Sequence, residues 1–202
     1  MLARLAGQYA IVAIVSGRPA QEVRSLLGVP EVEVFGLYGL TEGQADPGTI
    51  EVARSAAQAA ANEVEGAWVE DKGRSLAVHY RAAPDPRAAE VILSQRLSEA
   101  AGRFGLALLP GKMVLELAPQ DIPGKGGVVM RECRSRRLEA CLYAGDDRAD
   151  QNAFAALEGL RNEGLFAVKI AVRAEETPKE LIEAADLVVD RPAGLVRFLQ
   201  AL

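Results

Sequence analysis

The sequence predicts an α/β fold, in which a Rossmann-like parallel sheet carries an inserted α+β unit. At both ends of the chain, short apolar runs finish at a turn and are followed by a helical pattern. This is typical of parallel strands covered by helices on both faces. In the middle, apolar and polar residues alternate as they do in antiparallel strands. Because ligands of parallel sheets bind at the carboxyl ends of the strands, we expect the functional site there.

The parallel part is predicted from four apolar runs and the helical patterns beside them. Strands are expected over residues 10–15, 138–144, 166–172 and 187–189. Helices are expected over residues 2–8, 19–27, 150–161 and 178–185, and from about Pro192 onward. Residues 1–39 and 121–202 would together form one discontinuous core.

Residues 40–120 are expected to form a separate α+β cap domain. Its helices are predicted over residues 50–64 and 86–103, and its strands over 67–70, 75–81, 106–109 and 113–117. Leu76 and Val78 alternate with Ala77 and His79, so we expect one buried and one wet face. Trp68, just before the hairpin turn, is expected in the hairpin core, and the alternative is a platform for a sugar.

Composition excludes several classes of partner. The chain has 202 residues, half of them apolar, which suffices for a core in one domain or in a domain plus an insert. A formal charge of −5 argues against nucleic acid and anionic membrane surfaces, which select basic patches. No run of about 18 apolar residues and no signal-peptide layout occurs. We therefore expect a cytoplasmic protein.

The residues that bind transition metals are scarce. Cys133 and Cys141 are expected to be free core thiols, with a disulfide or metal pair as the alternative. His79 is the one histidine, which excludes a site with several histidines. A metal here would need oxygen ligands.

Two adjacent carboxylates, Asp146 and Asp147, follow a predicted strand and a glycine, and Asp150 is close by. Adjacent carboxylates repel unless a cation or amide donors compensate them. Mg²⁺ takes one or two protein carboxylates and keeps several waters, so the string suits that ion. The alternative is an acid-rich helix N-terminus stabilised by the helix dipole.

Two further residues suit a phosphate. Ser16 ends the first predicted strand, where its hydroxyl and the following amides can hold a phosphate oxygen, although a plain helix N-cap explains it nearly as well. Lys125, between Gly124 and Gly126, can neutralise a phosphate as a point charge, and the alternative is a solvated lysine. In the insert, polar side chains can bond sugar hydroxyls or form a solvated hairpin: Glu70, Asp71, Lys72, His79, Arg81 and Glu116.

The ordered set Ser16, Lys125 and Asp146–Asp147 resembles motifs two, three and four of the haloacid-dehalogenase-like phosphatase superfamily. The interval between motifs two and three leaves room for an α+β cap. Within that superfamily, the chain resembles the trehalose-6-phosphate phosphatase family over essentially its whole length. The supporting strings are Val-Ser-Gly-Arg-Pro at 15–19, Gly-Leu-Tyr-Gly-Leu at 36–40, Val-Glu-Asp-Lys-Gly at 69–73, Leu-Ala-Val-His-Tyr-Arg at 76–81, Gly-Lys-Met-Val-Leu-Glu-Leu at 111–117 and Gly-Asp-Asp-Arg at 145–148.

The resemblance implies Mg²⁺-dependent hydrolysis of trehalose 6-phosphate to trehalose and phosphate, through an aspartyl-phosphate. It implies that Asp146 and Asp147 bind the metal and that Ser16 and Lys125 are catalytic. The implied substrate-binding residues are Ser16, Gly17, Arg18, Glu70, Lys72, Glu116 and Lys125, those of the insert contacting glucose hydroxyls. A trehalose-6-phosphate synthase is an implied partner.

The sequence departs from the family pattern most at the nucleophile. No Asp-x-Asp precedes Ser16, although the family carries its nucleophile on a central strand between those that end at Ser16 and at Asp146. A start placed too late, a truncation or a true loss would each explain this. We expect the 202-residue chain to be inactive, with two strand edges lacking their ladder partner.

Two smaller departures follow. Ala149, Gln151 and Asn152 stand where the family usually has Thr, Glu and Asp, which weakens the negative charge around the metal. Ala118 stands where an arginine is common, which removes one salt bridge near the substrate. The alternatives to the leading function are another sugar-phosphate phosphatase of the same cap class and a catalytically dead, sugar-phosphate-binding regulatory module.

Overall fold

The computed structural model describes residues 1–40 and 47–202. The chain divides into two compact units. The core unit comprises Met1–Leu40 and Pro123–Leu202, and the insert unit comprises Thr41–Ile122. The predicted boundaries, after residue 39 and before residue 121, fall beside these. Among the described residues, no helix is both long and apolar enough to cross a membrane.

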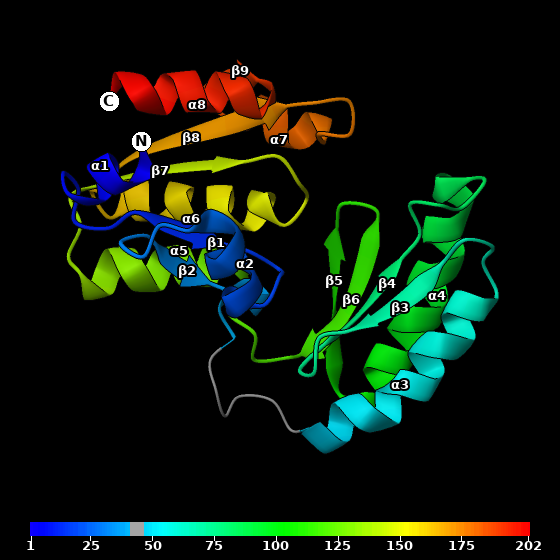
Figure 1. Cartoon of the computed structure of the whole chain (residues 1–202). Helices are drawn as coiled ribbons and strands as arrows, with labels where there is room; N and C mark the ends of the chain where they lie inside the picture. Colours follow the sequence, from blue (N-terminus) through cyan, green and yellow to red (C-terminus); the bar gives the residue numbers. More distant parts are fainter. Residues whose placement is uncertain (41–46) are drawn as a thin grey trace. The chain divides into compact units, whose positions relative to one another are not determined.

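The core unit consists of parallel strands and helices (Figure 1). Its first segment contains α1 (Leu2–Ala6), β1 (Ala13–Val15), α2 (Ala20–Leu27), β2 (Glu33–Phe35) and the 3-10 turn η1 (Leu37–Gly39). Its second segment contains α5 (Gly124–Ser135), β7 (Ala140–Gly145), α6 (Asp150–Asn162), β8 (Phe166–Arg173), α7 (Lys179–Glu183), β9 (Leu187–Asp190) and α8 (Arg191–Ala201). The α/β class predicted from the alternating runs and helices is confirmed.

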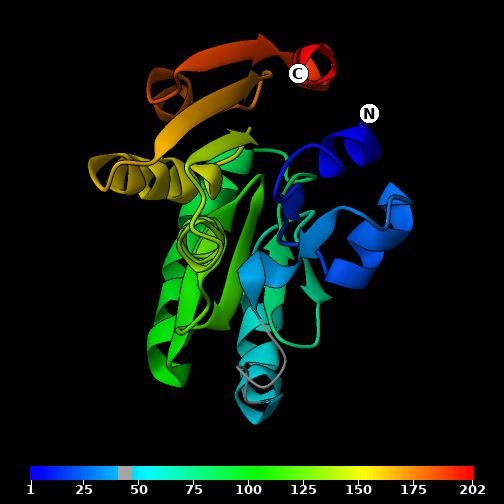
Figure 2. The same ribbon diagram turned by 90° about the vertical axis from the view of Figure 1, so that its left-hand side faces the viewer.

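The strands of the core unit form two parallel sheets. One pairs β1 with β2, and the other has the order β7-β8-β9. Within the described residues, β1 is paired with β2 alone and β7 with β8 alone, so each has one edge without a ladder. Leu142 on β7 is 37% exposed. Figure 2 shows the two sheets as separate ribbons.

One strand of the core unit was not predicted. β2 has only three residues, and Pro30 and two glutamates surround its apolar positions. Pairing with β1 forms it: the amide of Glu33 donates to the carbonyl of Val12, and that of Ser16 donates to the carbonyl of Phe35, both at 2.9 Å. A long-range ladder therefore overrides a weak local pattern.

The helices of the core unit pack on these sheets, and α5 lies close to α6. A β-carbon on Gly126 would lie 2.4 Å from the carbonyl oxygen of Asn152, so only glycine allows this approach. Val129 and Cys133 of α5 share a buried cluster with Leu157 of α6. The two ends of the chain also meet, since Arg4 donates to carbonyls near the end of α8.

The insert unit is a four-stranded antiparallel sheet with two helices. Its elements are α3 (Pro47–Asn62), β3 (Trp68–Asp71), β4 (Leu76–His79), α4 (Pro86–Phe104), β5 (Leu106–Gly111) and β6 (Val114–Pro119), and the strand order is β3-β4-β6-β5. The α4 boundaries follow from local chemistry. The Asp85 side chain accepts from two amides of the first turn, and Gly105 ends the helix with φ 64°.

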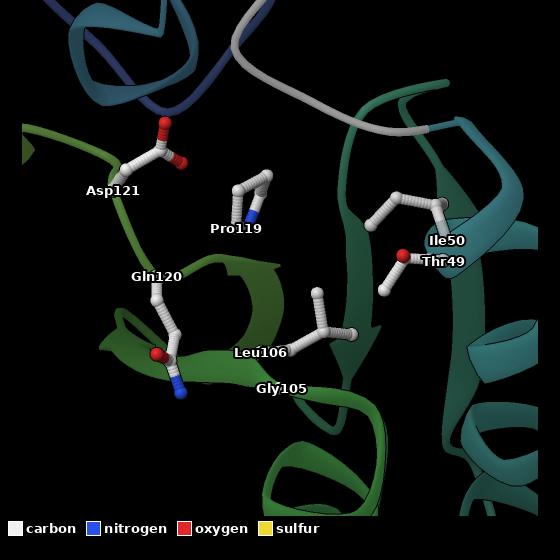
Figure 3. A pocket seen from close by; sticks show the side chains of 7 residues that line it. All are labelled: Thr49, Ile50, Gly105, Leu106, Pro119, Gln120 and Asp121. Carbon is white, nitrogen blue, oxygen red and sulfur yellow. The ribbon is translucent and has the colours of Figure 1, made fainter.

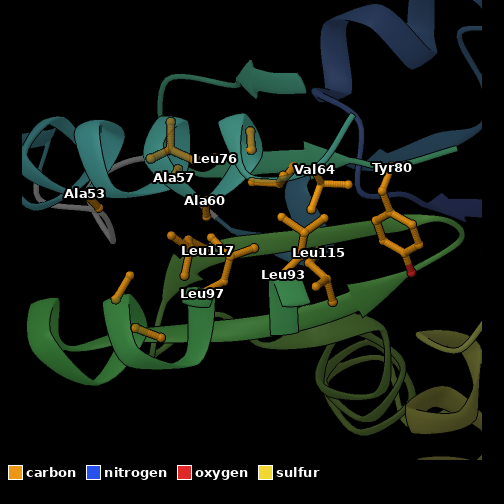
Figure 4. Close-up of a cluster of buried hydrophobic side chains, with 14 of the residues drawn as sticks. Ala53, Ala57, Ala60, Val64, Leu76, Tyr80, Leu93, Leu97, Leu115 and Leu117 are labelled. Carbon is orange, nitrogen blue, oxygen red and sulfur yellow. The ribbon is translucent and has the colours of Figure 1, made fainter. Parts of the chain in front are cut away.

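Both helices cover one face of this sheet. Small residues at helical spacing on α3, including Ala53, Ala57 and Ala60, let the backbone approach Leu93 and Leu97 of α4. Figure 4 shows these side chains meeting Leu76 of β4 and the two leucines of β6, Leu115 and Leu117. The remaining apolar residues at alternate strand positions lie in the same cluster. The predicted buried face of the sheet is therefore confirmed.

The opposite, helix-free face differs from the prediction at two residues. Trp68 is 53% exposed and not in the hairpin core, because the register places it opposite His79 on this face. The face is also not uniformly wet, since Ala77 is fully buried. Alternation alone shows which residues share a face and does not show what covers it.

Candidate functional site

The turn after β7 is organised by Asp150, the first residue of α6. Its Oδ2 accepts from the amides of Asp146 at 2.9 Å and Asp147 at 3.0 Å. A β-carbon on Gly145 would lie 2.2 Å from the Asp150 carboxyl carbon, so the glycine makes room for that carboxylate. Asp150 lies in the first turn of α6, and Asp147, which precedes the helix, accepts from the Asp150 amide at 3.1 Å. Both acids therefore contribute to the helix N-terminus.

Lys125 is held against these acids from the start of α5. Its Nζ donates to Oδ1 of Asp150 at 2.7 Å and to both carboxylate oxygens of Asp147 at 3.2 Å. The Tyr143 hydroxyl donates to the same Asp150 oxygen at 2.7 Å. The Lys125 side chain is 9% exposed, so it is not the solvated lysine of the alternative interpretation.

The charges of this cluster shift one another. Burial disfavours the ammonium form of Lys125, but the Asp150 and Asp147 carboxylates outweigh it and raise its pKa. Burial and the negative charge of Asp150 raise the pKa of Asp147. Burial acts on Asp150 too, but Lys125 and the hydrogen bonds from Asp147 and Tyr143 lower its pKa. Burial and Asp150 raise the pKa of Tyr143 far above its usual value, so its hydroxyl stays a donor.

The loop that follows β1 holds Ser16 outside α2. The amide of Arg18 donates to the Ser16 hydroxyl at 3.1 Å, and the N-cap of α2 is Pro19. The N-cap interpretation of Ser16 is therefore wrong. The Arg18 side chain is largely exposed and pairs with Glu22 one turn further along.

Residues 36–40 connect this loop with α5. The amide of Tyr38 donates to the Ser16 carbonyl at 2.9 Å, and that of Leu37 donates to the Arg18 carbonyl at 3.0 Å. A β-carbon on Gly39 would lie 2.2 Å from Cγ2 of Val128 in α5, so the segment packs directly on the Lys125 helix. Through this segment, the structure connects the Ser16 loop with the helix that carries Lys125.

Two residues of this connection are strained. Leu37 and Tyr38 have φ of 47° and 54°, a region that non-glycine residues rarely adopt. The Tyr38 ring is buried on the Ser16 loop, where a β-carbon on Gly17 would lie 2.5 Å from the tyrosine hydroxyl. Gly17 therefore makes room for the Tyr38 ring, and the strained turn at Leu37 and Tyr38 positions the ring there.

The donor set at the end of β7 suits a hard divalent cation. Asp146 and Asp147 offer adjacent carboxylates, and Asp150 adds a third negative charge that Lys125 contacts most closely. No cluster of three or more His, Cys, Asp or Glu side chains with metal-ligand geometry occurs among the described residues. The pair of carboxylates at Asp146 and Asp147 suits Mg²⁺, which uses one or two carboxylates together with water and phosphate oxygens. It does not suit zinc, which prefers histidine and cysteine ligands. Cys133 and Cys141 are free.

In the insert unit, Lys72 and Glu116 lie against each other. Lys72 donates to Oε2 of Glu116 at 2.9 Å, and the buried Ser75 hydroxyl donates to Oε1 at 2.5 Å. The side chains of Lys72 and Glu116 are only 8% and 1% exposed. On the neighbouring strands β3 and β4, Nε2 of His79 lies 2.8 Å from Oε2 of Glu70.

A hollow in the insert unit, of about 290 Å³, lies elsewhere (Figure 3). Its lining includes Thr49 and Ile50 of α3, Leu106 of β5, and Pro119 and Asp121 at the end of β6. None of the predicted site residues lines it, and we assign it no role.

Sequence reasoning did not identify Tyr143 and Tyr38 as parts of the site. Tyr143 lies two positions before Gly145 in β7, and its hydroxyl donates to Asp150, seven residues further along the chain. Tyr38 is inside a string quoted only for its resemblance. Neither has a chemical signal of its own, because buried tyrosines usually serve packing.

Solved structures with similar folds show the fold class. The C-terminal domain of Candida albicans trehalose-6-phosphate phosphatase superposes with a TM-score of 0.78 at 18% identity, over 98% of this chain and 79% of that one. The sucrose-phosphatase of Synechocystis sp. PCC6803 superposes with a TM-score of 0.59 at 15% identity, over 99% and 88%. The fold is a haloacid-dehalogenase-like α/β core with an α+β cap, as predicted.

The sequence comparison identifies the family. The trehalose-phosphatase family model matches residues 1–185, so the chain belongs to that family. The trehalose-phosphate phosphatase of Mycobacterium avium is 32% identical over 220 residues, covering 100% of this chain and 54% of the relative. That of Mycobacterium marinum is 34% identical over 208 residues, covering 93% and 50%. The chain spans about half the length of the curated relatives it matches.

Proposed function

We propose that this chain provides the phosphate-binding and sugar-binding parts of a cytoplasmic phosphatase that hydrolyses trehalose 6-phosphate to trehalose and phosphate. Membership of the trehalose-phosphatase family supports the substrate. The single observation that carries the proposal is the position of Lys125, a buried cation held by Asp147 and Asp150 at the carboxyl end of β7.

In this proposal, the core unit binds the phosphoryl group. The Ser16 hydroxyl, which the Arg18 amide holds in place, and the Gly17 amide donate to phosphate oxygens, as groups before a helix commonly do. Lys125 adds a positive charge that its two carboxylates keep protonated and oriented. Donors fixed in this way stabilise the charge of the transferring phosphoryl group without reorganising during the reaction.

Asp146 and Asp147 would hold Mg²⁺, which supplies charge neutralisation for the phosphoryl oxygens when it is bound. Asp150 has a different role in this scheme. Its two oxygens accept from the amides of the turn, from Tyr143 and from Lys125, so it orients the residues that bind metal and phosphate.

The attacking group in this family is an aspartate, and residues 1–15 contain no Asp or Glu. The open edges of β1 and β7 suit a strand that carries it. An aspartate on such a strand would attack phosphorus to form an aspartyl-phosphate, the P–O bond to trehalose would break, and the second aspartate of the pair would protonate the leaving oxygen. The same aspartate would then deprotonate a water that attacks phosphorus and releases phosphate. Asp146 cannot take over this role while it binds the metal.

The insert unit would select the sugar. Carboxylates accept from sugar hydroxyls and an ammonium donates to them, which suits Glu70, Lys72 and Glu116. The same chemistry leaves other sugar phosphates as alternative substrates.

A second candidate function is a sugar-phosphate-binding regulatory module, with a trehalose-6-phosphate synthase as its partner. One fold neighbour, at 12% identity and a TM-score of 0.71, is described as the C-terminal domain of a trehalose synthase regulatory protein.

The test compares two proteins in the same Mg²⁺ concentration: the 202-residue chain, and a form extended at its N-terminus by a strand that carries an Asp-x-Asp pair. Phosphate release is measured with trehalose 6-phosphate, sucrose 6-phosphate and p-nitrophenyl phosphate. We expect turnover of trehalose 6-phosphate by the extended form alone, with no turnover after Ser16→Ala or Lys125→Met.

Turnover by the short chain that Asp146→Asn abolishes would contradict the assignment of the nucleophile. An extended form that binds trehalose 6-phosphate without hydrolysing it would favour the regulatory module. Equal turnover of the two disaccharide phosphates would contradict selection of trehalose.

A further inference from the structure

The helix-free face of the insert sheet carries a row of polar and aromatic side chains. In the register of β3 and β4, Trp68 faces His79, and Glu70 faces Ala77. Ala77 in turn faces Glu116 on β6. Because alternate residues of a strand point to the same face, Trp68, Glu70, His79 and Glu116 all belong to the face opposite α3 and α4.

The two carboxylates of this row differ in how they are used. Both oxygens of Glu116 accept from Lys72 and Ser75, and the side chain is 1% exposed. The Glu70 side chain is 36% exposed, and of its two carboxylate oxygens only Oε2 contacts His79. Glu70 can therefore offer Oε1 to a ligand hydroxyl as the structure stands, whereas Glu116 acts on a ligand through Lys72.

His79 has contacts that fix its ring. It stacks on Trp68 with ring centroids 4.3 Å apart and an interplanar angle of 13°. Its Nε2 lies 2.8 Å from Oε2 of Glu70. Because a carboxylate oxygen only accepts, Nε2 must carry the proton, and the stacked ring sets the direction of that N–H bond.

We infer that His79 is a positioning residue for sugar recognition: braced by Trp68, it orients the Glu70 carboxylate toward a hydroxyl of the bound sugar. The inference rests on the proposed function for the substrate class, a sugar phosphate. It adds Trp68 and His79 to the residues that determine specificity, and it assigns Glu116 an indirect role through Lys72. A carboxylate held by a second side chain binds a hydroxyl more tightly, since less rotamer freedom is lost on binding.

The chain provides two built-in reporters for a test, because it contains one histidine and one tryptophan. Long-range ¹H–¹⁵N NMR of the 202-residue chain should show His79 protonated at Nε2, and Glu70→Ala should remove this preference. Calorimetry with trehalose 6-phosphate and with inorganic phosphate then separates sugar binding from phosphate binding. Trp68 emission should change with the sugar phosphate and not with phosphate.

The variants separate the hydrogen bond from the stack. His79→Phe keeps a ring on Trp68 and removes the donor, so trehalose 6-phosphate should bind about tenfold more weakly, the loss of one hydrogen bond to a charged group. His79→Gln places an amide donor near Nε2 and should recover most of that affinity. Both should bind phosphate like the parent chain. Glu63→Gln is the matched control, since Glu63 pairs with Arg96 on the helical side of the insert at similar exposure.

Three outcomes would overturn the inference. An unchanged affinity for trehalose 6-phosphate in His79→Phe would overturn it and leave the proposed function intact. Equal losses of affinity for the sugar phosphate and for phosphate would also overturn the inference and leave the proposed function intact, because His79 would then only maintain the fold. Absence of sugar-phosphate binding by the parent chain, with phosphate still bound, would overturn the proposed substrate class and this inference with it.

Discussion

The ammonium group of Lys125 lies 2.7 Å from Oδ1 of Asp150, and the two side chains are 9% and 3% exposed. They come from the first turns of α5 and α6, whose close approach depends on Gly126. The same Asp150 carboxylate holds the amides of Asp146 and Asp147. This buried pair therefore fixes the positions of Lys125 and of the Asp146–Asp147 turn relative to each other, which are the groups proposed to bind phosphate and metal.

Asp150→Asn should lower the free energy of unfolding by about 3 kcal/mol, because it leaves a buried ammonium without its closest counter-charge. Urea unfolding followed by circular dichroism measures this. Glu163→Gln makes the same chemical change in the exposed pair with Arg134 and should leave the midpoint unchanged. Equal midpoints for the two variants would show that the Lys125–Asp150 pair does not stabilise the fold.

Asp146→Asn should weaken Mg²⁺ binding at least about tenfold without shifting the unfolding midpoint, since one metal-binding carboxylate is lost. Asp150→Asn should mainly lower stability. Calorimetric Mg²⁺ titrations of both variants, in the extended form proposed above, make the comparison. A larger loss of Mg²⁺ affinity in Asp150→Asn than in Asp146→Asn would reverse the metal assignment.

Gly17→Ala should destabilise the Ser16 loop, because the new methyl group would lie 2.6 Å from Cζ of Tyr38. We expect a loss of about 1–3 kcal/mol in stability and weaker phosphate binding. Gly159→Ala is the control: apart from the adjoining backbone of α6, no atom lies within 4 Å of its β-carbon position, and alanine favours helix. Thermal unfolding and phosphate titration test both, and an undisturbed Gly17→Ala would exclude a tight contact with Tyr38.

The two carboxylates of the insert should respond differently to substitution. Glu116→Gln should cost about 2 kcal/mol of stability, because it removes the buried negative charge that lies 2.9 Å from the Lys72 ammonium. Glu70→Ala should leave stability nearly unchanged and lower turnover of trehalose 6-phosphate, but not of p-nitrophenyl phosphate, in the extended form. If Glu70→Ala reduced both activities equally, Glu70 would have no role in sugar selection.

The fold was predictable wherever one face of an element is buried within its own unit. The buried alanines of α3 and the alternation of Leu76 and Val78 are local patterns with the periods of a helix and a strand. β2 was not predictable, because its three residues depend on a ladder with β1. Trp68 was misplaced because periodicity shows which residues share a face and not which face is covered.

The sequence by itself determined the α/β class, the family, and the order in which Ser16, Lys125 and Asp146–Asp147 occur, since these depend on periodicity and on short strings of residues. Only the tertiary structure decided that Asp150 organises the cluster, that residues 36–40 connect the Ser16 loop with α5, and that His79 lies between Trp68 and Glu70. These contacts join residues far apart in the chain or on adjacent strands. They form through packing and burial, whose partners no local pattern specifies.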